Sequence, residues 1–288
     1  MIVAREVEEL VARPRTVAIG SFDGVHLGHR LVLDTARAVG PSPTIVTFWP
    51  HPRLVLGNEV ELLSTLERRL ELLEAVGVEE VLVVDFTPAV AELPAEEFAE
   101  TVLRRIGATT VVAGENFRFG HAAAGDGRML ARLGFDVRLV PLLDGVSSTR
   151  IRALLRDGDV VGAAQLLGRP AELDGTVVLG DQRGGTLGYP TANLAPPPHL
   201  AVPAYGIYAG KALGHRAAIS IGVNPHYGVG ERRIEPHLLD FDGDLYGRRL
   251  LVELWLRLRD EQAFASEAEL VAQIGRDVEA TRAAERPV

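Results

Sequence analysis

Short apolar runs alternate with longer amphipathic stretches through the first half of the chain. The apolar runs are rich in Val, Ile and Thr, and the stretches between them carry leucines and alanines at helical spacing. This alternation predicts an α/β fold, a parallel sheet with helices on both faces. The expected strands cover residues 16–20, 44–48, 80–86, 109–114 and 136–140.

One helix between these strands shows both of its ends in the sequence. Ser64 and Glu67 make a capping box, leucines follow at helical spacing, and Gly77 supplies a left-handed stop. We therefore expect a helix over residues 64–77.

The second half has a different pattern. Two short helical segments, 148–156 and 160–167, precede "LGRP", and from residue 174 strand-like runs follow one another between Gly and Pro turns. Strands without intervening helices favour a small antiparallel barrel or sandwich. A terminal helix is expected from Ser266, with Glu269 completing its capping box, to about Thr281. The expected strands cover residues 175–180, 206–213, 216–222, 232–241 and 248–259.

This change of pattern predicts two domains. The boundary is placed between residues 168 and 173, so residues 1–168 form the α/β domain and residues 169–288 the barrel domain with its terminal helix. A length of 288 residues agrees with two ordinary domains.

Composition narrows the classes of function. The chain is 47% hydrophobic and 24% charged with a net charge of −9, which suits a globular protein and argues against a nucleic-acid partner. It has no cysteine, which excludes thiolate catalysis, disulfides and cysteine-based metal sites. No apolar run approaches the roughly 20 residues that cross a bilayer. We expect a cytoplasmic protein without a membrane partner, and its self-association into a homo-oligomer is left open.

The stretch "GSFDGVHLGHR", residues 20–30, lies where the first strand gives way to a helix. The carboxyl edge of such a strand is where open α/β sheets bind ligands, and the helix start presents N–H groups that suit phosphate. His26 and His29 fall on the same side of the first turn, and Gly28 leaves the space between them open. The arrangement fits two imidazoles that hold a phosphate, with an adenine ring close to the glycine.

Two other interpretations of this stretch remain. It could be a glycine-rich turn with two exposed histidines, or a zinc site completed by another histidine such as His51. For the zinc site, no third ligand has convincing local spacing.

Two further stretches contain candidate ligand-binding residues. In "VSSTRIR", Arg150 and Arg152 lie at the start of a helix, where each cation opposes the helix dipole by ~0.3–1 kcal/mol and a bound polyphosphate would remove the conflict. In "GGTLGYPTANL", glycines allow backbone N–H groups to approach phosphate, and Thr191 and Asn193 supply oxygen donors for Mg²⁺. Solvated arginines and a plain Gly-Pro connection are the alternatives.

Together these motifs resemble a known family. "GSFDGVHLGHR" with "SSTRIR" resembles the H-x-G-H nucleotidyltransferases, which have a Rossmann-like fold. "VTFWPHPRLVL" and "GENFRFG" are similar to the flavin adenylyltransferase module of the bifunctional bacterial riboflavin kinase/FAD synthetases, and "GYPTANL" resembles the riboflavin kinase signature. The resemblance covers essentially the whole chain. It implies that riboflavin and ATP give FMN, and that FMN and ATP then give FAD and pyrophosphate, both with Mg²⁺.

For the first module the resemblance implies catalytic roles for His26, His29 and Arg150. The two histidines would neutralise the ATP phosphates, and Asn116 would help to hold phosphate or Mg²⁺. The implied nucleotide site comprises Gly20, Ser21, Phe22, Asp23, Gly28, Ser147, Ser148, Thr149 and Arg150, and the implied flavin site comprises Phe48, Pro50, His51, Pro52 and Asn116.

For the second module it implies that Thr191 and Asn193 coordinate Mg²⁺ and the ATP phosphates, with Gly188 in the nucleotide site. Glu235 matches the glutamate that acts as general base on the 5′-hydroxyl of riboflavin. Some positions depart from the pattern and bear on affinity and rate: Gly185 replaces a common basic residue, Ala171 a tyrosine and His226 a threonine. Two rival functions are an adenylyltransferase of another acceptor and a flavin-binding regulator with decayed sites.

Overall fold

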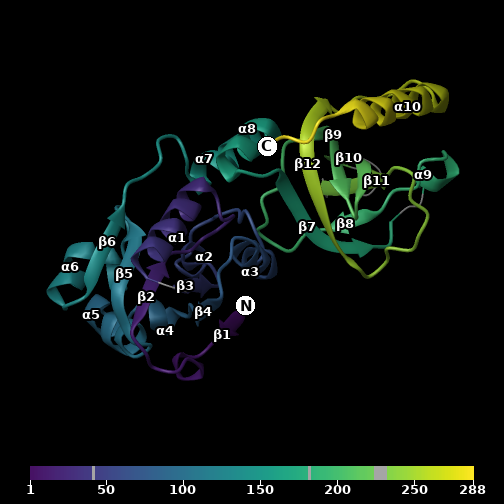
Figure 1. The fold of residues 1–288 in the computed structure, drawn as a ribbon. Helices are drawn as coiled ribbons and strands as arrows, with labels where there is room; N and C mark the ends of the chain where they lie inside the picture. The colour runs from purple at the N-terminus through teal and green to yellow at the C-terminus, as the bar shows by residue number, and fades with distance from the viewer. Residues whose placement is uncertain (41–42, 181–182, 224–231) are drawn as a thin grey trace. The chain divides into compact units, whose positions relative to one another are not determined.

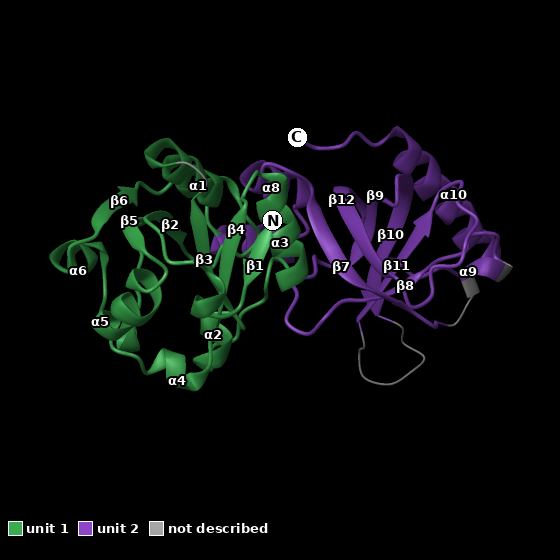
Figure 2. Cartoon of the chain, turned by 60° about the horizontal axis from the view of Figure 1, so that its bottom comes forward, with its two compact units in different colours: residues 1–147 green, residues 148–288 purple. Residues whose placement is uncertain are grey.

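The computed structural model describes residues 1–40, 43–180, 183–223 and 232–288. The chain folds into two compact units, residues 1–147 and 148–288, which are coloured separately in Figure 2. The second unit begins with α7 (Ser148–Arg156) and α8 (Val160–Leu167). The two units divide at residues 147 and 148, whereas the boundary at residue 168 between the two proposed activities stays a prediction.

Unit 1 is built on a parallel sheet with strand order β1-β4-β3-β2-β5-β6 (Figure 1). The five strands expected from the sequence are confirmed within one or two residues at each end. The edge strand β1 was not expected, because its three residues are too few to show a period and two of them are exposed. The strands are β1 (Ile2–Ala4), β2 (Arg15–Ile19), β3 (Thr44–Trp49), β4 (Glu80–Asp85), β5 (Ala108–Gly114) and β6 (Asp136–Val140).

Helices cover both faces of this sheet, as predicted. Val17 and Ile19 of β2 belong to one apolar cluster and Ala18 to the other, as the alternation of side chains along a strand requires. The helices of unit 1 are α1 (Leu27–Val39), α2 (Pro52–Val55), α3 (Leu66–Ala75), α4 (Pro88–Ala91), α5 (Ala95–Phe98) and α6 (Gly127–Arg132), with η1 (Val7–Glu9), η2 (Ala99–Arg104) and η3 (His121–Ala123).

The start of α3 corrects one expectation. Thr65, not Ser64, is the N-cap, and its hydroxyl accepts the Arg68 N–H at 3.0 Å. The Ser64 hydroxyl is buried and accepts the Gly24 N–H at 3.1 Å, so it is committed to the loop after β2. Gly77 has φ +79°, which confirms the left-handed stop.

Unit 2 contains an antiparallel sheet with strand order β11-β10-β9-β12-β7-β8 (Figure 2). The Ala192 N–H donates to the Pro236 carbonyl at 3.0 Å, which joins the two edges into a nearly closed barrel. The predicted strands are present, although β7 begins earlier and β11 ends earlier than expected, and β8 was not anticipated. The strands are β7 (Ala171–Val178), β8 (Asn193–Ala195), β9 (Gly206–Ala212), β10 (His215–Val223), β11 (Arg232–Leu238) and β12 (Arg249–Arg259).

Two helices accompany the barrel strands. The short α9 (Arg183–Thr186) follows β7, and α10 (Glu267–Ala283) ends the fold. The capping box of α10 is confirmed, because Ser266 Oγ accepts the Glu269 N–H at 3.2 Å and a Glu269 carboxylate oxygen accepts the Ala265 N–H at 3.1 Å.

Each unit holds one of the two tryptophans. Trp49 ends β3, with the guanidinium of Arg69 over its ring at 5.5 Å. Trp255 lies in β12, where its indole N–H donates to Glu253 at 2.7 Å and Arg216 lies over the ring.

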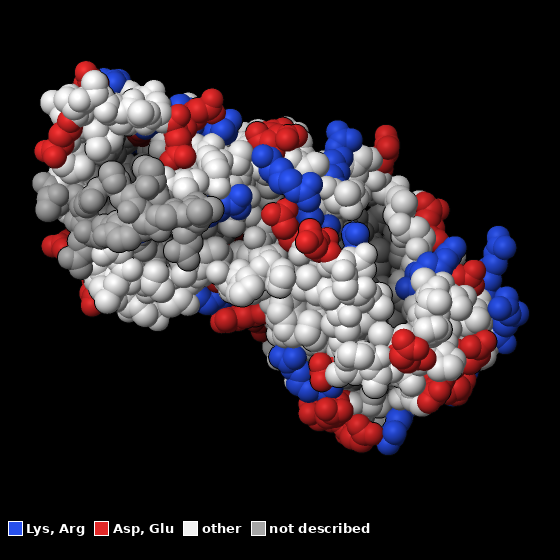
Figure 3. All heavy atoms as spheres, turned by 180° about the vertical axis from the view of Figure 1, so that it is seen from behind, with Lys and Arg blue, Asp and Glu red and all other residues white. Residues whose placement is uncertain are grey.

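The surface charges are mixed. On the face drawn in Figure 3, acidic and basic side chains are interspersed, and no continuous basic surface forms. Within the described ranges, no helix combines the length and the apolar character needed to cross a membrane.

Candidate functional site

The first candidate site is the loop between β2 and α1, at the carboxyl end of β2. Phe22 and Val25 adopt left-handed φ values of 49° and 41°, with Gly24 between them at 79°. Such a conformation costs of order 1–3 kcal/mol for each residue that is not glycine. Both side chains are 1% exposed, so burial in the core holds the loop in this shape.

The two histidines of the motif form a stacked pair. Their ring centroids lie 3.6 Å apart with an interplanar angle of 15°. His26 is the N-cap of α1, and its Nδ1 accepts the His29 N–H at 3.3 Å. In a neutral His26 ring the proton therefore sits on Nε2, which becomes a donor. Phe22 packs edge-on against His29 at 5.3 Å and fixes that ring from the other side.

Gly28 explains why the histidines can take this position. A Cβ added at Gly28 would lie 3.1 Å from Cε1 and 3.2 Å from Nδ1 of His26, closer than packed carbon atoms normally approach. The same Cβ would lie 3.9 Å from Val146, the residue before Ser147. The structure thus brings the end of unit 1 beside the histidine motif.

Asp23 does not face open space. Its side chain is 2% exposed and accepts the N–H groups of Leu63 and Ser64 at 3.0–3.2 Å. The carboxylate therefore anchors the motif loop to the segment before α3. Gly20 and Ser21 lie beside this loop, where a Cβ on Gly20 would meet the Phe22 ring at 3.4 Å and the Ser21 carbonyl accepts the Thr47 hydroxyl at 3.0 Å.

The residues expected to bind flavin occupy different environments. Phe48 is 7% exposed and packs edge-on against Phe86 in the core, at a centroid distance of 5.7 Å. His51 is the N-cap of α2, with Nδ1 accepting the Arg53 N–H at 3.2 Å, and Pro52 begins that helix. Pro50 and Asn116 are exposed, and Asn116 lies in the turn after β5. Their contact with flavin stays a prediction.

Arg150 and Arg152, near the start of α7, lie in different environments. The helix begins at Ser148 as predicted, with Thr149 and Arg150 exposed, whereas Arg152 is buried at 6% exposure. The burial of Arg152 makes a solvated surface role impossible for that side chain. A role for Arg150 in triphosphate binding stays a prediction.

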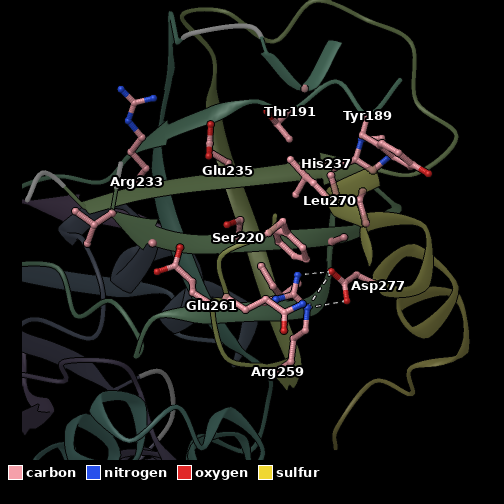
Figure 4. A pocket seen from close by; sticks show the side chains of 18 residues that line it. Tyr189, Thr191, Ser220, Arg233, Glu235, His237, Arg259, Glu261, Leu270 and Asp277 are labelled. Atoms are coloured by element: carbon pink, nitrogen blue, oxygen red, sulfur yellow. Dashed lines mark hydrogen bonds and ion pairs between the residues drawn. The ribbon is translucent and has the colours of Figure 1, made fainter. Parts of the chain in front are cut away.

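The second candidate site is a cavity of about 390 Å³ in unit 2 (Figure 4). Glu235 lies on β11, in register with Ser220 on β10, and both side chains line the cavity with Thr191. The structure therefore brings together two residues from separate motifs. A second cavity of about 380 Å³ shares Thr191 with the first and is bordered by residues 241–246, the "FDGDLY" turn.

The loop that carries Thr191 is held in place from two sides. The Tyr189 N–H donates to the Gly184 carbonyl at 2.8 Å, and a Cβ on Gly184 would lie 3.2 Å from Thr191 Oγ1. His237 on β11 holds the next turn, with Nδ1 2.7 Å from the Pro190 carbonyl and its ring edge-on to Tyr189 at 5.5 Å. Sequence reasoning missed His237, although it lies two residues after Glu235 and so on the same face of the strand.

Asn193 lies apart from this cavity. It begins β8, and its amide group occupies the space where a Cβ on Gly180 would project. Gly188 has φ +84°, a value that favours glycine. Gly185 is exposed and Ala171 begins β7 in the core, while His226 lies outside the described residues.

The far end of the cavity contains an ion pair that the sequence did not reveal. Arg259 on β12 donates to both carboxylate oxygens of Asp277 on α10, at 3.0 and 2.7 Å (Figure 4). Glu261 lines the same cavity, and burial raises the pKa of its carboxyl. Among the described residues, no three His, Asp or Glu side chains cluster in a way that could hold a metal ion.

Comparisons with known proteins match the two parts of the chain to two enzyme families. Residues 9–151 match the family model for FAD synthetase, and residues 167–284 match the model for riboflavin kinase. Bifunctional riboflavin kinase/FMN adenylyltransferases are 35% identical in Listeria monocytogenes, covering 93% of this chain and 92% of that protein, and 34% identical in Escherichia coli K12, covering 96% of each.

A solved structure shares the whole fold. A protein from Streptococcus pneumoniae, named as a macrolide-efflux protein, is 32% identical with a TM-score of 0.87 over 98% of each chain. That name describes the other protein alone. The two family models and the curated relatives together show that the chain belongs to the family of bifunctional riboflavin kinase/FMN adenylyltransferases.

Proposed function

We propose that the chain converts riboflavin to FAD in two ATP-dependent steps. Unit 2 phosphorylates riboflavin to FMN, and the histidine site of unit 1 transfers AMP to FMN and releases pyrophosphate. The observation that carries this proposal is that Thr191 and Glu235, from two separate motifs, line one cavity in the unit that matches riboflavin kinase.

In the kinase step Glu235 is the general base. Its carboxylate takes the proton of the ribityl 5′-hydroxyl, and the hydroxyl oxygen attacks the γ-phosphorus of ATP. The bond from that phosphorus to the bridging oxygen breaks, and ADP leaves. We assign riboflavin to the cavity with Glu235 and ATP to the neighbouring cavity, because Thr191 borders both.

The residues near Thr191 suit Mg²⁺. A hydroxyl and an amide oxygen, Thr191 Oγ1 and Asn193 Oδ1, are hard oxygen donors of the kind that this ion takes together with phosphate oxygens. The glycine at position 180 leaves room for the Asn193 amide beside the loop. When bound, the ion neutralises phosphate charge, while Thr191 and Glu235 align the two substrates.

The transfer step needs no general base. A phosphate oxygen of FMN attacks the α-phosphorus of ATP, the bond to the β-phosphate oxygen breaks, and pyrophosphate leaves. His26 and His29 donate to the phosphates and stabilise the charge that accumulates on them. Gly28 leaves room beside His26 for the adenine, and we assign Ser147, Ser148 and Arg150 to the triphosphate.

The substrates also suggest where the chain works. Riboflavin, FMN and ATP are small cytoplasmic molecules, so we place the enzyme in the cytoplasm. A net charge of −9 and the mixed charges in Figure 3 support small-molecule partners rather than nucleic acid.

A turnover assay tests the proposal directly. The purified chain is incubated with riboflavin and Mg-ATP, and the flavins are separated by chromatography. We expect FMN first and FAD afterwards, and FAD alone when FMN is supplied. Samples without ATP are the control, and a chain that forms neither product from riboflavin or from FMN contradicts the proposal.

A further inference from the structure

Arg69 is a fully buried arginine beside Asp23 of the histidine motif in unit 1. It lies on α3 and its residue is 0% exposed. The Nη1 group donates to the Phe48 carbonyl at 3.1 Å and to the Thr47 hydroxyl at 3.4 Å. Nη2 lies 3.9 Å from a carboxylate oxygen of Asp23, and the guanidinium carbon lies over the Trp49 ring, 5.5 Å from its centroid. One side chain therefore contacts both the motif loop and the end of β3.

This position is unfavourable for stability. Burial lowers the pKa of Arg69, because desolvation disfavours the charged form more than the nearby Asp23 carboxylate supports it. Among the described residues, neither Nε nor Nη2 has a hydrogen-bond acceptor within reach. The inward positions of α3 at Leu66, Leu72 and Leu73 are apolar, and an apolar residue at position 69 would often be as stable. A cost of this kind within an active-site region points to a geometric role.

The segments joined by Arg69 are the two that the transfer step must align. Thr47 links Arg69 to the motif loop, because its hydroxyl accepts a hydrogen bond from Arg69 and donates one to the Ser21 carbonyl at 3.0 Å. The motif loop that includes Ser21 leads through Phe22 to the edge of the His29 ring. On the other side, Phe48 and Trp49 lead directly into the proposed flavin wall at residues 50–52.

We propose that Arg69 is a positioning residue for AMP transfer, holding the histidine loop and the flavin wall at a fixed separation. The inference rests on the proposed function of unit 1. A lysine could supply the charge, but only the planar fork of arginine reaches Phe48 and Thr47 on one side and approaches Asp23 on the other. Arg69 and Thr47 are both 0% exposed, so in this proposal their effect passes through the loop and the strand end.

The test compares Arg69→Met with Arg68→Met. Arg68 is the neighbouring residue on α3 and forms a more exposed ion pair with Glu71, so it is a matched control. FAD formation from supplied FMN is measured as kcat and as KM for FMN and ATP, well below the melting temperature. Riboflavin phosphorylation is measured in the same preparation.

We expect Arg69→Met to lower kcat/KM for FAD formation by about 10- to 100-fold, as small misplacements of reacting groups do. Riboflavin phosphorylation stays unchanged, Arg69→Lys gives an intermediate loss, and Arg68→Met matches the parent chain. A purely structural role predicts a lower melting temperature with normal kinetics.

A second variant avoids the loss of a buried charge. Thr47→Val keeps the shape of the side chain and removes only the hydroxyl between Arg69 and Ser21, and we expect a smaller loss in the same direction. If Arg69→Met does not fold, Thr47→Val and Arg69→Lys still test the positioning role of Arg69. Normal FAD kinetics in the folded variants, or an equal loss of both activities, overturns the inference. Absence of FAD formation by the parent chain instead overturns the proposed function.

Discussion

The two candidate sites are constructed in opposite ways. The histidine site of unit 1 comes from one short stretch, in which a strained loop and the first turn of α1 stack two rings. The cavity of unit 2 is assembled from a glycine-rich loop, the four barrel strands β9, β10, β11 and β12, and α10, which are distant in sequence. A local site depends on backbone strain, whereas an assembled site depends on strand register.

The two sites also differ in the chemistry that we propose for them. Phosphorylation of an alcohol requires removal of a proton, and this is the role that we propose for the Glu235 carboxylate of unit 2. The phosphate of FMN is already ionised as a nucleophile, so the role that we propose for His26 and His29 of unit 1 is hydrogen-bond donation rather than proton removal. The difference predicts that single substitutions will separate the two activities.

The largest expected effect is on the kinase step. Glu235→Gln keeps the shape of the side chain but removes the base, and we expect riboflavin phosphorylation to fall by about 10²–10⁴-fold. FAD formation from supplied FMN stays at the parent rate in the same preparation. Glu285→Gln, an exposed carboxylate of the same unit, is the control. An equal loss of FAD formation would show that the two sites are not independent.

The reverse separation is expected for His29→Ala. His29→Ala removes one hydrogen-bond donor to the phosphates. We expect this loss to lower FAD formation from FMN by about 10²–10³-fold, while riboflavin phosphorylation persists. Both rates are followed by chromatography of the flavins. His121→Ala, which removes an exposed histidine paired with Glu92, serves as the control. A His29→Ala chain that makes FAD normally contradicts the phosphate-binding role of the pair.

Gly28→Ala tests whether ATP binding requires the open space beside His26. The added methyl group displaces the His26 ring, so we expect KM for ATP in the FAD step to rise about 3- to 10-fold. Alanine favours a helix over glycine, which offsets part of the cost of moving the buried His26 ring. Gly275→Ala on α10, where the new Cβ makes an ordinary 3.4 Å contact, should leave the FAD step unchanged. An unaltered KM in Gly28→Ala argues against a nucleotide next to this residue.

The smallest effect on activity is expected for a substitution at the amino ends of the unit 1 strands, opposite to the end that leads into the histidine loop. Glu80, Arg15 and Thr44 begin β4, β2 and β3, and Glu80 accepts hydrogen bonds from the other two. Burial alone raises the pKa of Glu80, but these hydrogen bonds and the arginine charge outweigh it and lower the pKa. Glu80 therefore stabilises the fold above its unfolded pKa of about 4.3, and this contribution is lost as pH falls through the lower folded value.

Thermal unfolding across pH measures this contribution. We expect Glu80→Gln to lower the free energy of unfolding at pH 7 by about 2–4 kcal/mol, since it leaves the buried Arg15 without its carboxylate. The difference from the parent chain shrinks towards acid, and both activities are kept while the chain is folded. Glu79→Gln is the adjacent exposed control. A difference that grows on acidification would reverse the sign of the assigned pKa shift.

Much of the fold could be predicted because it depends on local pattern. The longer strands of unit 1 are apolar runs rich in β-branched residues, and the capping box of α10 and the stop at Gly77 are signals within a few residues. The strands β1 and β8 have three residues each, so their pairing is decided by neighbouring strands rather than by their own period. Ser64 was assigned as a cap because its competing partner, Gly24, is distant in sequence.

The candidate sites were predictable to different degrees for the same reason. His26, Gly28 and His29 could be related by helix geometry alone. Glu235 required the family resemblance, since a glutamate on a barrel strand has no local signature. Asp23, Arg69 and His237 acquire their contacts only through the fold, so no pattern in the sequence identifies their partners.

The division of the two tryptophans has a practical consequence. Replacing Trp255 with Phe leaves Trp49 as the sole indole fluorophore, beside Arg69 and the proposed flavin wall, and the reciprocal replacement leaves the barrel alone to report. Unfolding of each half, and quenching of its emission by an added flavin, can then be recorded in the intact chain without any attached dye.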